Sequence, residues 1–418
     1  MMHILDKAKS HKQFLIYFFV IALGIVTGLA DIGILQTAGA VIADLFIKLF
    51  RLISLPIISL SIIVTVATLA GEESSKKLWQ RTLIYTLSTT LIAATVSCIM
   101  YLIIQPKNFI MAASHTNLAV DKQMNYTQFI ANLLPTNIFA PFIEHQVMGV
   151  LLLSIAVGIA IRYIPEDDAK DAAINFFRGL HGIFLVITKW VITILPIGLF
   201  GFITTTFVQL KEGVDISGIG EYLLIIVGAN LIQGFVVLPL WLSYNKIKPF
   251  HTMHKMLPAL SIAFFSKSSA GTLPVTMNTA EKRLGIDPKV SRFVLPLCTT
   301  INMNGCAAFI FATVIFLMQN QGIPITLSMM AIWILIATIA AVGNAGVPMG
   351  CFFLSASLLT SMNVPIELLG IILPFYTVID MVETSLNVWS DSCVVAVVNE
   401  RALMDETTHP IFNHEIVS

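Results

Sequence analysis

From Phe293 to Ile366 the chain carries no charged side chain, yet the helix-length segment Phe375–Cys393 soon after it carries three carboxylates. An apolar stretch of this length can cross a bilayer more than once. Of all 418 residues only 11% are charged and 56% are hydrophobic, whereas a water-soluble chain typically has about 25% charged residues. Because helices satisfy their own backbone hydrogen bonds in lipid, the chain is predicted to be an all-α polytopic membrane protein.

The polar residues of the last predicted helix share one face. At about 100° per residue they fall within an arc of roughly 100°. They are Asp380, Glu383, Thr384, Asn387 and Asp391. A carboxylate at the centre of a bilayer costs about 2.5–3.5 kcal/mol, so three of them on one stripe indicate a binding face inside a helix bundle.

Charge and cysteine content exclude other classes of protein. The formal net charge is zero, which gives no reason to expect a nucleic-acid partner. The five cysteines lie in apolar surroundings without CxxC spacing, so we expect small core residues and neither a disulfide framework nor a metal cluster. They are Cys98, Cys298, Cys306, Cys351 and Cys393.

The first half of the chain has regularly alternating apolar and basic segments. The apolar segments are Gln13–Ala30, Val41–Ala70, Thr82–Ile104, Tyr126–Tyr163, Ala172–Phe207 and Ile219–Tyr244. Lys and Arg gather in alternate connections, which the positive-inside rule places in the cytoplasm. We therefore expect a multi-pass membrane protein with a cytoplasmic N-terminus and six crossings before Lys246.

In the second half each apolar segment is interrupted by small or polar residues. Residues 252–280 are predicted to form a hairpin broken near Lys267 and Pro274, and residues 323–362 a second hairpin broken at Val342–Gly350. The helix predicted over 288–318 is interrupted at Thr299–Cys306. The stripe helix, over 365–400, would return the C-terminus to the cytoplasm. Non-helical backbone at membrane depth is tolerated where it lines a protected site, and paired hairpin-plus-helix units indicate an inverted repeat.

Four motifs resemble the dicarboxylate/amino acid:cation symporter family, the relatives of glutamate and neutral amino acid transporters. S-K-S-S-A-G-T-L-P (Ser266–Pro274) is similar to the family's first hairpin tip, and G-N-A-G-V-P (Gly343–Pro348) to its second. N-M-N-G-C (Asn302–Cys306) resembles its N-M-D-G-T motif. Asp380–Asp391 matches the D-M-x-x-T-x-x-N-x-x-x-D core of its last helix. The resemblance spans nearly the whole chain.

The resemblance implies a multi-pass protein of a bacterial inner membrane, with about eight transmembrane helices, two re-entrant hairpins, an elevator-type mechanism and a homotrimer. Residues 1–81 would be mainly scaffold, 82–125 the third helix and an outer loop on the transport side, and 126–244 mainly scaffold with helix six on the transport side. Residues 245–400 would form the transport core, and 401–418 a cytoplasmic tail.

The resemblance also implies ligand roles, carried over by position. Asp380 would hold the α-amino group of the substrate, and its α-carboxylate would meet Asn387 with the backbone near Ser268–Ser269 and Gly346–Val347. Glu383, Thr384 and Lys267 would line the same site. One sodium site would use Asp391 with oxygens around Asn302, Asn387 and Cys298. A second would use Thr300, Met303 and the carbonyls between Val342 and Asn344.

Three positions depart from the family pattern. Asn304 replaces the Asp of N-M-D-G-T, which puts in doubt a third sodium site with Ser88 and Thr89. Glu383 stands where an Arg grips acidic side chains, and Lys267 where the inner hairpin often has an Arg.

The function expected is therefore symport of sodium with a small neutral amino acid resembling serine, threonine or alanine. Sodium ions are co-transported ligands, no cofactor is expected, and the chain is not predicted to be an enzyme. Sodium- or proton-coupled uptake of glutamate or aspartate is the alternative, and an ion channel is a further one, since polar hairpins also build selectivity filters.

Overall fold

The structure is a computed structural model that describes residues 16, 19–30, 32–68, 76–108, 137–143, 147–211, 217–344, 349–361 and 367–408. Within these ranges every regular element is a helix, which confirms the all-α prediction. Gly346 and Val347 lie outside the described residues, as do 1–15 and 409–418.

The described helices of the first half follow a short helix over Phe19–Leu29. They are α2 (Gly33–Thr68), α3 (Lys76–Ile104), α5 (Ala140–Ile143), α6 (Val147–Arg162), α7 (Asp167–Thr193), α8 (Leu195–Lys211), α9 (Ser217–Ile232), the π-helical η2 (Gln233–Val237) and α10 (Leu238–Tyr244). The run predicted over Ala172–Phe207 as one segment is two helices, α7 and α8, bent by 54°. Pro196 in the first turn of α8 explains the break, because proline has no N–H to continue the hydrogen-bond ladder.

The second half contains helix pairs at the positions of the two predicted hairpins, together with the interrupted helix and the stripe helix. Its elements are α11 (Pro249–Ser266), α12 (Ser269–Thr279), the π-helical η3 (Ala280–Leu284), α13 (Pro288–Ile301), α14 (Asn304–Asn320), α15 (Leu327–Val342), α16 (Gly350–Ser361) and α17 (Glu367–Thr408). α17 continues to Thr408, beyond the end that was expected for the last helix at residue 400, while the tail expected over 401–418 stays a prediction.

Three helices of the described residues are long and apolar enough to cross a membrane, or four if the bent α7–α8 pair counts as one span. The three are Lys77–Ile104, Gly218–Tyr244 and Pro288–Asn320. The chain is thus built for a membrane, while the count of about eight spans and the re-entry of the hairpins stay predictions.

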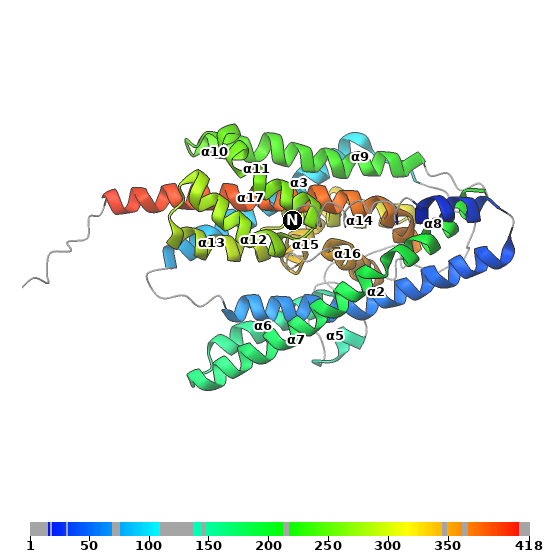
Figure 1. Cartoon of the computed structure of the whole chain (residues 1–418), viewed down its shortest axis with the longest axis horizontal. Helices are drawn as coiled ribbons and strands as arrows, with labels where there is room; N and C mark the ends of the chain where they lie inside the picture. Colours follow the sequence, from blue (N-terminus) through cyan, green and yellow to red (C-terminus); the bar gives the residue numbers. More distant parts are fainter. Residues whose placement is uncertain are drawn as a thin grey trace, which may run out of the picture.

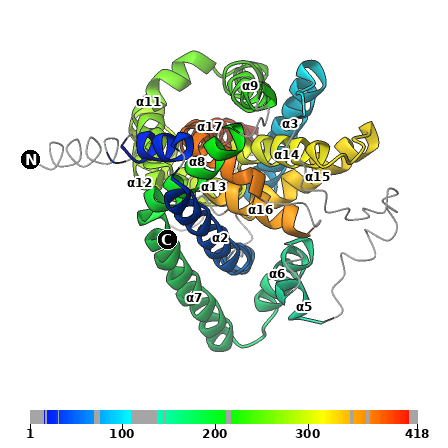
Figure 2. The ribbon, with the colours of Figure 1, turned by 90° about the vertical axis from the view of Figure 1, so that its right-hand side faces the viewer.

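α17 runs through the middle of the molecule (Figures 1 and 2), with α9 on one side and α2, α6 and α7 on the other. α14 lies beside it and is enclosed on all sides, since every residue from Asn304 to Met318 is buried. α11 and α13 pack against α17, and α2 packs against α6, α7 and α8. The two helices with the most polar motifs therefore occupy the most protected position in the fold.

The first hairpin turns at Lys267 and Ser268. Lys267 adopts a left-handed conformation (φ 54°) that ends α11, and the Ser268 hydroxyl caps α12 by accepting a hydrogen bond from the Gly271 amide at 3.0 Å. The break therefore precedes Pro274, which lies inside α12. In the second hairpin Gly343 packs against α2, where an added Cβ would meet Ile58 and Ile62 at 3.2 and 3.4 Å.

The interruption predicted in the helix over 288–318 is confirmed. α13 ends at Ile301 and α14 begins at Asn304, so Asn302 and Met303 form a two-residue break in an otherwise buried span. Directly after it, Gly305 allows α14 to approach α17 closely, because a Cβ on this glycine would lie 2.7 Å from the Cα of Glu383.

This approach predicts a stability difference between two glycine variants. Gly305→Ala forces the backbones of α14 and α17 apart and should lower the free energy of unfolding by about 1–3 kcal/mol. Gly220→Ala in α9 is the matched control, because nothing lies within 4 Å of its added Cβ. Thermal unfolding of the purified protein in detergent measures both. Equal unfolding temperatures would contradict the close approach.

Candidate functional site

The five stripe residues of α17 are all buried, with exposed fractions of 4% for Asp380, 1% for Glu383, 5% for Thr384, 3% for Asn387 and 1% for Asp391. The sequence prediction that they face the interior is confirmed. The α13–α14 break, the start of α14 and Met349 before α16 supply hydrogen-bond partners to three of them, Asp391, Asn387 and Asp380. The described part of the chain thus places three carboxylates inside the helix bundle.

Asp391 is anchored to the helix break. The Asn302 side chain donates a hydrogen bond from Nδ2 to Asp391 Oδ1 at 2.9 Å. Asn302 Oδ1 in turn accepts from Thr89 Oγ1 at 3.0 Å and from Asn304 Nδ2 at 2.8 Å. Asn302 and Asp391, which were predicted to share one sodium site, are therefore brought together.

Two residues of this network were missed by the sequence analysis. Gln233 of η2 donates from Nε2 to Asn304 Oδ1 at 2.7 Å and to the Thr89 carbonyl at 3.1 Å. Ser390 accepts from Asn302 Nδ2 at 2.9 Å. Gln233 had a signal, since it is an amide in the middle of the apolar segment 219–244, and a buried amide needs partners.

Only some of the residues of the third sodium site implied by the family are brought together. Thr89 belongs to the Asn302 network, whereas Ser88 is exposed and donates to the Ile84 carbonyl of its own helix. Asn304 fills its position with amide hydrogen bonds. These residues hold the helix break in place without a carboxylate.

The other end of the stripe meets the second hairpin. The Met349 backbone amide donates to Asp380 Oδ2 at 3.2 Å. The positive charge of Lys267, at the tip of the first hairpin, acts on the same carboxylate. Ser269, beside that tip, is buried, and Ser268 is half-buried. Both hairpins thus contribute to the surroundings of Asp380.

The residues predicted for a second sodium site are only partly assembled. Asn344 Nδ2 approaches Met303 Sδ at 3.7 Å, so these two lie together. Val342, two residues before Asn344, is half-buried. The Thr300 hydroxyl bonds back to the Leu297 carbonyl at 2.8 Å, and the Cys298 carbonyl accepts from the Asn302 amide at 2.8 Å. Carboxylate, amide and carbonyl oxygens of this kind suit a hard cation such as Na⁺.

Beside the centre of the stripe lies a pair of cysteines whose contact the sequence did not predict. Cys306 of α14 and Cys351 of α16 are joined in a disulfide, so the expectation of separate core cysteines is wrong for these two. Forty-five positions separate them in the chain, and only the packing of α16 against α14 brings them together. Cys98, Cys298 and Cys393 are free and buried as expected.

Glu383 faces this pair. Its Oε2 accepts from the Tyr376 hydroxyl at 3.4 Å, and its Oε1 has no hydrogen-bond partner. Asn387 lies next along the stripe, accepting from the Gly305 amide at 2.9 Å.

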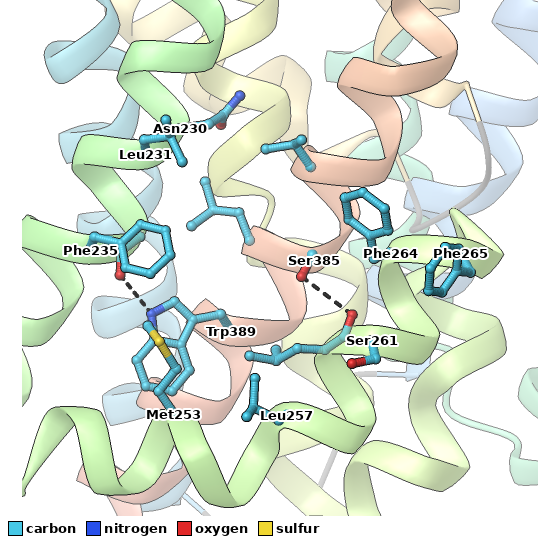
Figure 3. A pocket seen from close by; sticks show the side chains of 14 residues that line it. Asn230, Leu231, Phe235, Met253, Leu257, Ser261, Phe264, Phe265, Ser385 and Trp389 are labelled. Carbon is cyan, nitrogen blue, oxygen red and sulfur yellow. Dashed lines mark hydrogen bonds between the residues drawn. The ribbon is translucent and has the colours of Figure 1, made fainter.

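The opposite face of α17 borders a cavity of about 440 Å³ between α9, η2 and α11 (Figure 3). Trp389 donates from Nε1 to the Gly234 carbonyl at 3.0 Å and Ser385 to the Leu260 carbonyl at 3.3 Å, which fixes this wall. No charged side chain lines the cavity. A zwitterionic ligand would find no charged partner there, which leaves the carboxylate stripe as the candidate site.

Comparison with known proteins gives consistent matches. The sequence profile of the sodium:dicarboxylate symporter family matches residues 14–401. A putative sodium-dependent excitatory amino acid transporter, glt-4 of Caenorhabditis elegans, is 32% identical over 263 residues, which are 62% of this chain and 52% of the relative. The neutral amino acid transporter B(0) of Oryctolagus cuniculus is 26% identical over 387 residues, 84% of this chain and 71% of the relative.

A third relative is neutral amino acid transporter A of Homo sapiens, 27% identical over 291 residues, which are 69% of this chain and 54% of the relative. The chain thus spans about half the length of the first and third relatives.

Proposed function

We propose, because the chain belongs to the sodium:dicarboxylate symporter family, that it couples the entry of Na⁺ to the uptake of a small neutral amino acid such as serine, threonine or alanine. Membership of this family makes the chain a membrane transporter and not an enzyme. The substrate, the coupling ion and the mechanism are the proposal.

The observation that carries the proposal is the charge of the buried stripe. Asp380, Glu383 and Asp391 would contribute three negative charges and Lys267 one positive charge, for a sum of −2. Two sodium ions and a zwitterion bring the occluded site to zero, whereas aspartate or glutamate would leave an excess of −1. An uncompensated charge in a dry site is strongly unfavourable.

The roles of individual residues follow from their positions. Asp380 would bind the α-amino group, and Asn387 would bind the α-carboxylate together with the backbone of the two hairpin tips. Asp391 and Asn302 would hold one sodium ion, a role supported by the 2.9 Å contact between them. Met303 and Asn344 would contribute to a second ion beneath the second hairpin, supported by their proximity.

The arrangement of the helices supports an elevator-type mechanism. The helix pair α11–α12 and the broken helix α13–α14 pack against α17, while α2 packs against α6, α7 and α8. We propose that the first group moves as the transport domain against the second as scaffold. About eight spans, two re-entrant hairpins, a homotrimer and an inner-membrane location with cytoplasmic termini belong to the same proposal.

A sodium- or proton-coupled transporter of glutamate or aspartate is the alternative, and the printed name of the Caenorhabditis elegans relative favours it. Two observations favour a neutral substrate. Glu383 is buried in the centre of the stripe, where it would repel a second carboxylate. The two mammalian relatives are named neutral amino acid transporters.

The sodium assignment predicts a shift in ion dependence. Asp391→Asn removes the charged ligand and should raise the sodium concentration for half-maximal serine uptake by about tenfold or more, which corresponds to about 1.4 kcal/mol per decade. Asp44→Asn is the matched control, because this carboxylate is exposed and paired with Lys48. Uptake into proteoliposomes at varied sodium and fixed pH measures both variants. Unchanged sodium dependence in Asp391→Asn would remove this residue from the ion site.

The substrate assignment predicts an order of competition. Excess unlabelled alanine or threonine should suppress uptake of labelled serine more strongly than equal concentrations of aspartate or glutamate, because the acidic amino acids add a buried negative charge. The assay is run at two pH values, since a pH-dependent change in this order would indicate proton coupling. If aspartate or glutamate competes more strongly than alanine and threonine at both pH values, the charge argument is wrong.

A further inference from the structure

The group formed by Cys306, Cys351 and Glu383 has the composition of a metal site. The two sulfur atoms and a carboxylate oxygen of Glu383 lie within 4.8 Å of one another, and all three residues are 1% exposed. Among the described residues this is the one cluster of three such ligands. Each residue comes from a different helix, namely α14, α16 and α17.

A second observation points to a missing cation. Glu383 Oε1 is buried and has no hydrogen-bond partner, although its sister oxygen accepts from Tyr376. A buried carboxylate oxygen without a partner is strongly unfavourable. The two sulfurs lie within 4.8 Å of a carboxylate oxygen of Glu383, and a cation held among them would supply a partner to this carboxylate.

The ligands select the kind of cation. Thiolate sulfur is a soft ligand that favours Zn²⁺ and related ions over Na⁺ or Mg²⁺. Cys306 and Cys351 both lie in the first turn of their helices, where the helix dipole favours negative charge. Tetrahedral zinc with bonds of about 2.3 Å places two sulfurs about 3.8 Å apart, and the Cα atoms of the pair are 5.4 Å apart.

We propose that the reduced Cys306–Cys351 pair and Glu383 form a binding site for a soft divalent cation such as Zn²⁺ or Cd²⁺. A dithiol reductant supplies two electrons and two protons, breaks the S–S bond and leaves as a cyclic disulfide. The cation then forms two metal–sulfur bonds, the two thiol protons pass to solvent, and Glu383 donates the third ligand.

The bound cation ties the second hairpin to the centre of the fold, because Cys351 belongs to α16 and Cys306 to α14. It would also lie beside Asn387, whose Nδ2 approaches Cys306 Sγ at 3.5 Å. This last consequence rests on the proposed function, since Asn387 is there assigned to the substrate. The binding site itself does not.

The test is titration of purified, full-length protein with Cd²⁺ in detergent, followed by the ultraviolet charge-transfer absorption of cadmium–thiolate bonds. The reduced protein should bind one Cd²⁺ per chain with this absorption, and the oxidised protein should show none. Cys306→Ser and Cys351→Ser should each abolish the two-thiolate signal. Cys98→Ser is the matched control, a buried cysteine outside the cluster that should keep it.

Glu383→Gln keeps both thiols but removes the carboxylate that is the third ligand. The affinity for Cd²⁺ should therefore fall by at least about tenfold. Each variant is compared only if it elutes as a single symmetrical peak, and Glu383→Gln tests the site even if a cysteine variant does not fold. A signal that survives both cysteine changes, is absent from the reduced wild type, or keeps its affinity in Glu383→Gln overturns the proposal. No transport is measured, so failure of the proposed function would not affect the result.

Discussion

The rest of the structure depends on the hydrogen bond between Asn302 and the buried carboxylate of Asp391. A carboxylate inside an apolar bundle is tolerated only when hydrogen-bond donors point at it. The backbone of a continuous helix cannot supply these donors, because its N–H groups already bond to carbonyls of the same helix. In this chain α13 ends at Ile301 and α14 begins at Asn304, which leaves two residues outside the helices. The two residues between them carry the side chain that reaches Asp391.

The break in turn requires support from neighbouring helices. Thr89 on α3 bonds Asn302 in the break, Gln233 on η2 bonds Asn304 directly after it, and Ser390 on α17 bonds both asparagines. The polar network therefore couples α3, η2, the α13–α14 break and α17 at one point. An ion that displaced the Asn302–Asp391 contact would change the hydrogen bonds of all four elements. In this way an ion bound there could influence a neighbouring amino-acid site.

Much of this was predictable from the chain. The helical period placed Asp380, Glu383 and Asp391 on one face, and the run of polar and small residues at Thr299–Cys306 marked the break, because both are local patterns. Local patterns could not reveal contacts made across the fold. The Cys306–Cys351 pair and the reach of Gln233 to Asn304 depend on which helices pack together.

The central claim is that the buried stripe couples a sodium gradient to amino-acid uptake. The most direct measurement is uptake of labelled serine into sodium-free proteoliposomes after an inward sodium gradient is imposed at constant pH. The account predicts that internal serine rises transiently above the external concentration and that a sodium ionophore abolishes this rise. Serine that only equilibrates across the membrane, with or without the gradient, would indicate a channel and contradict the account.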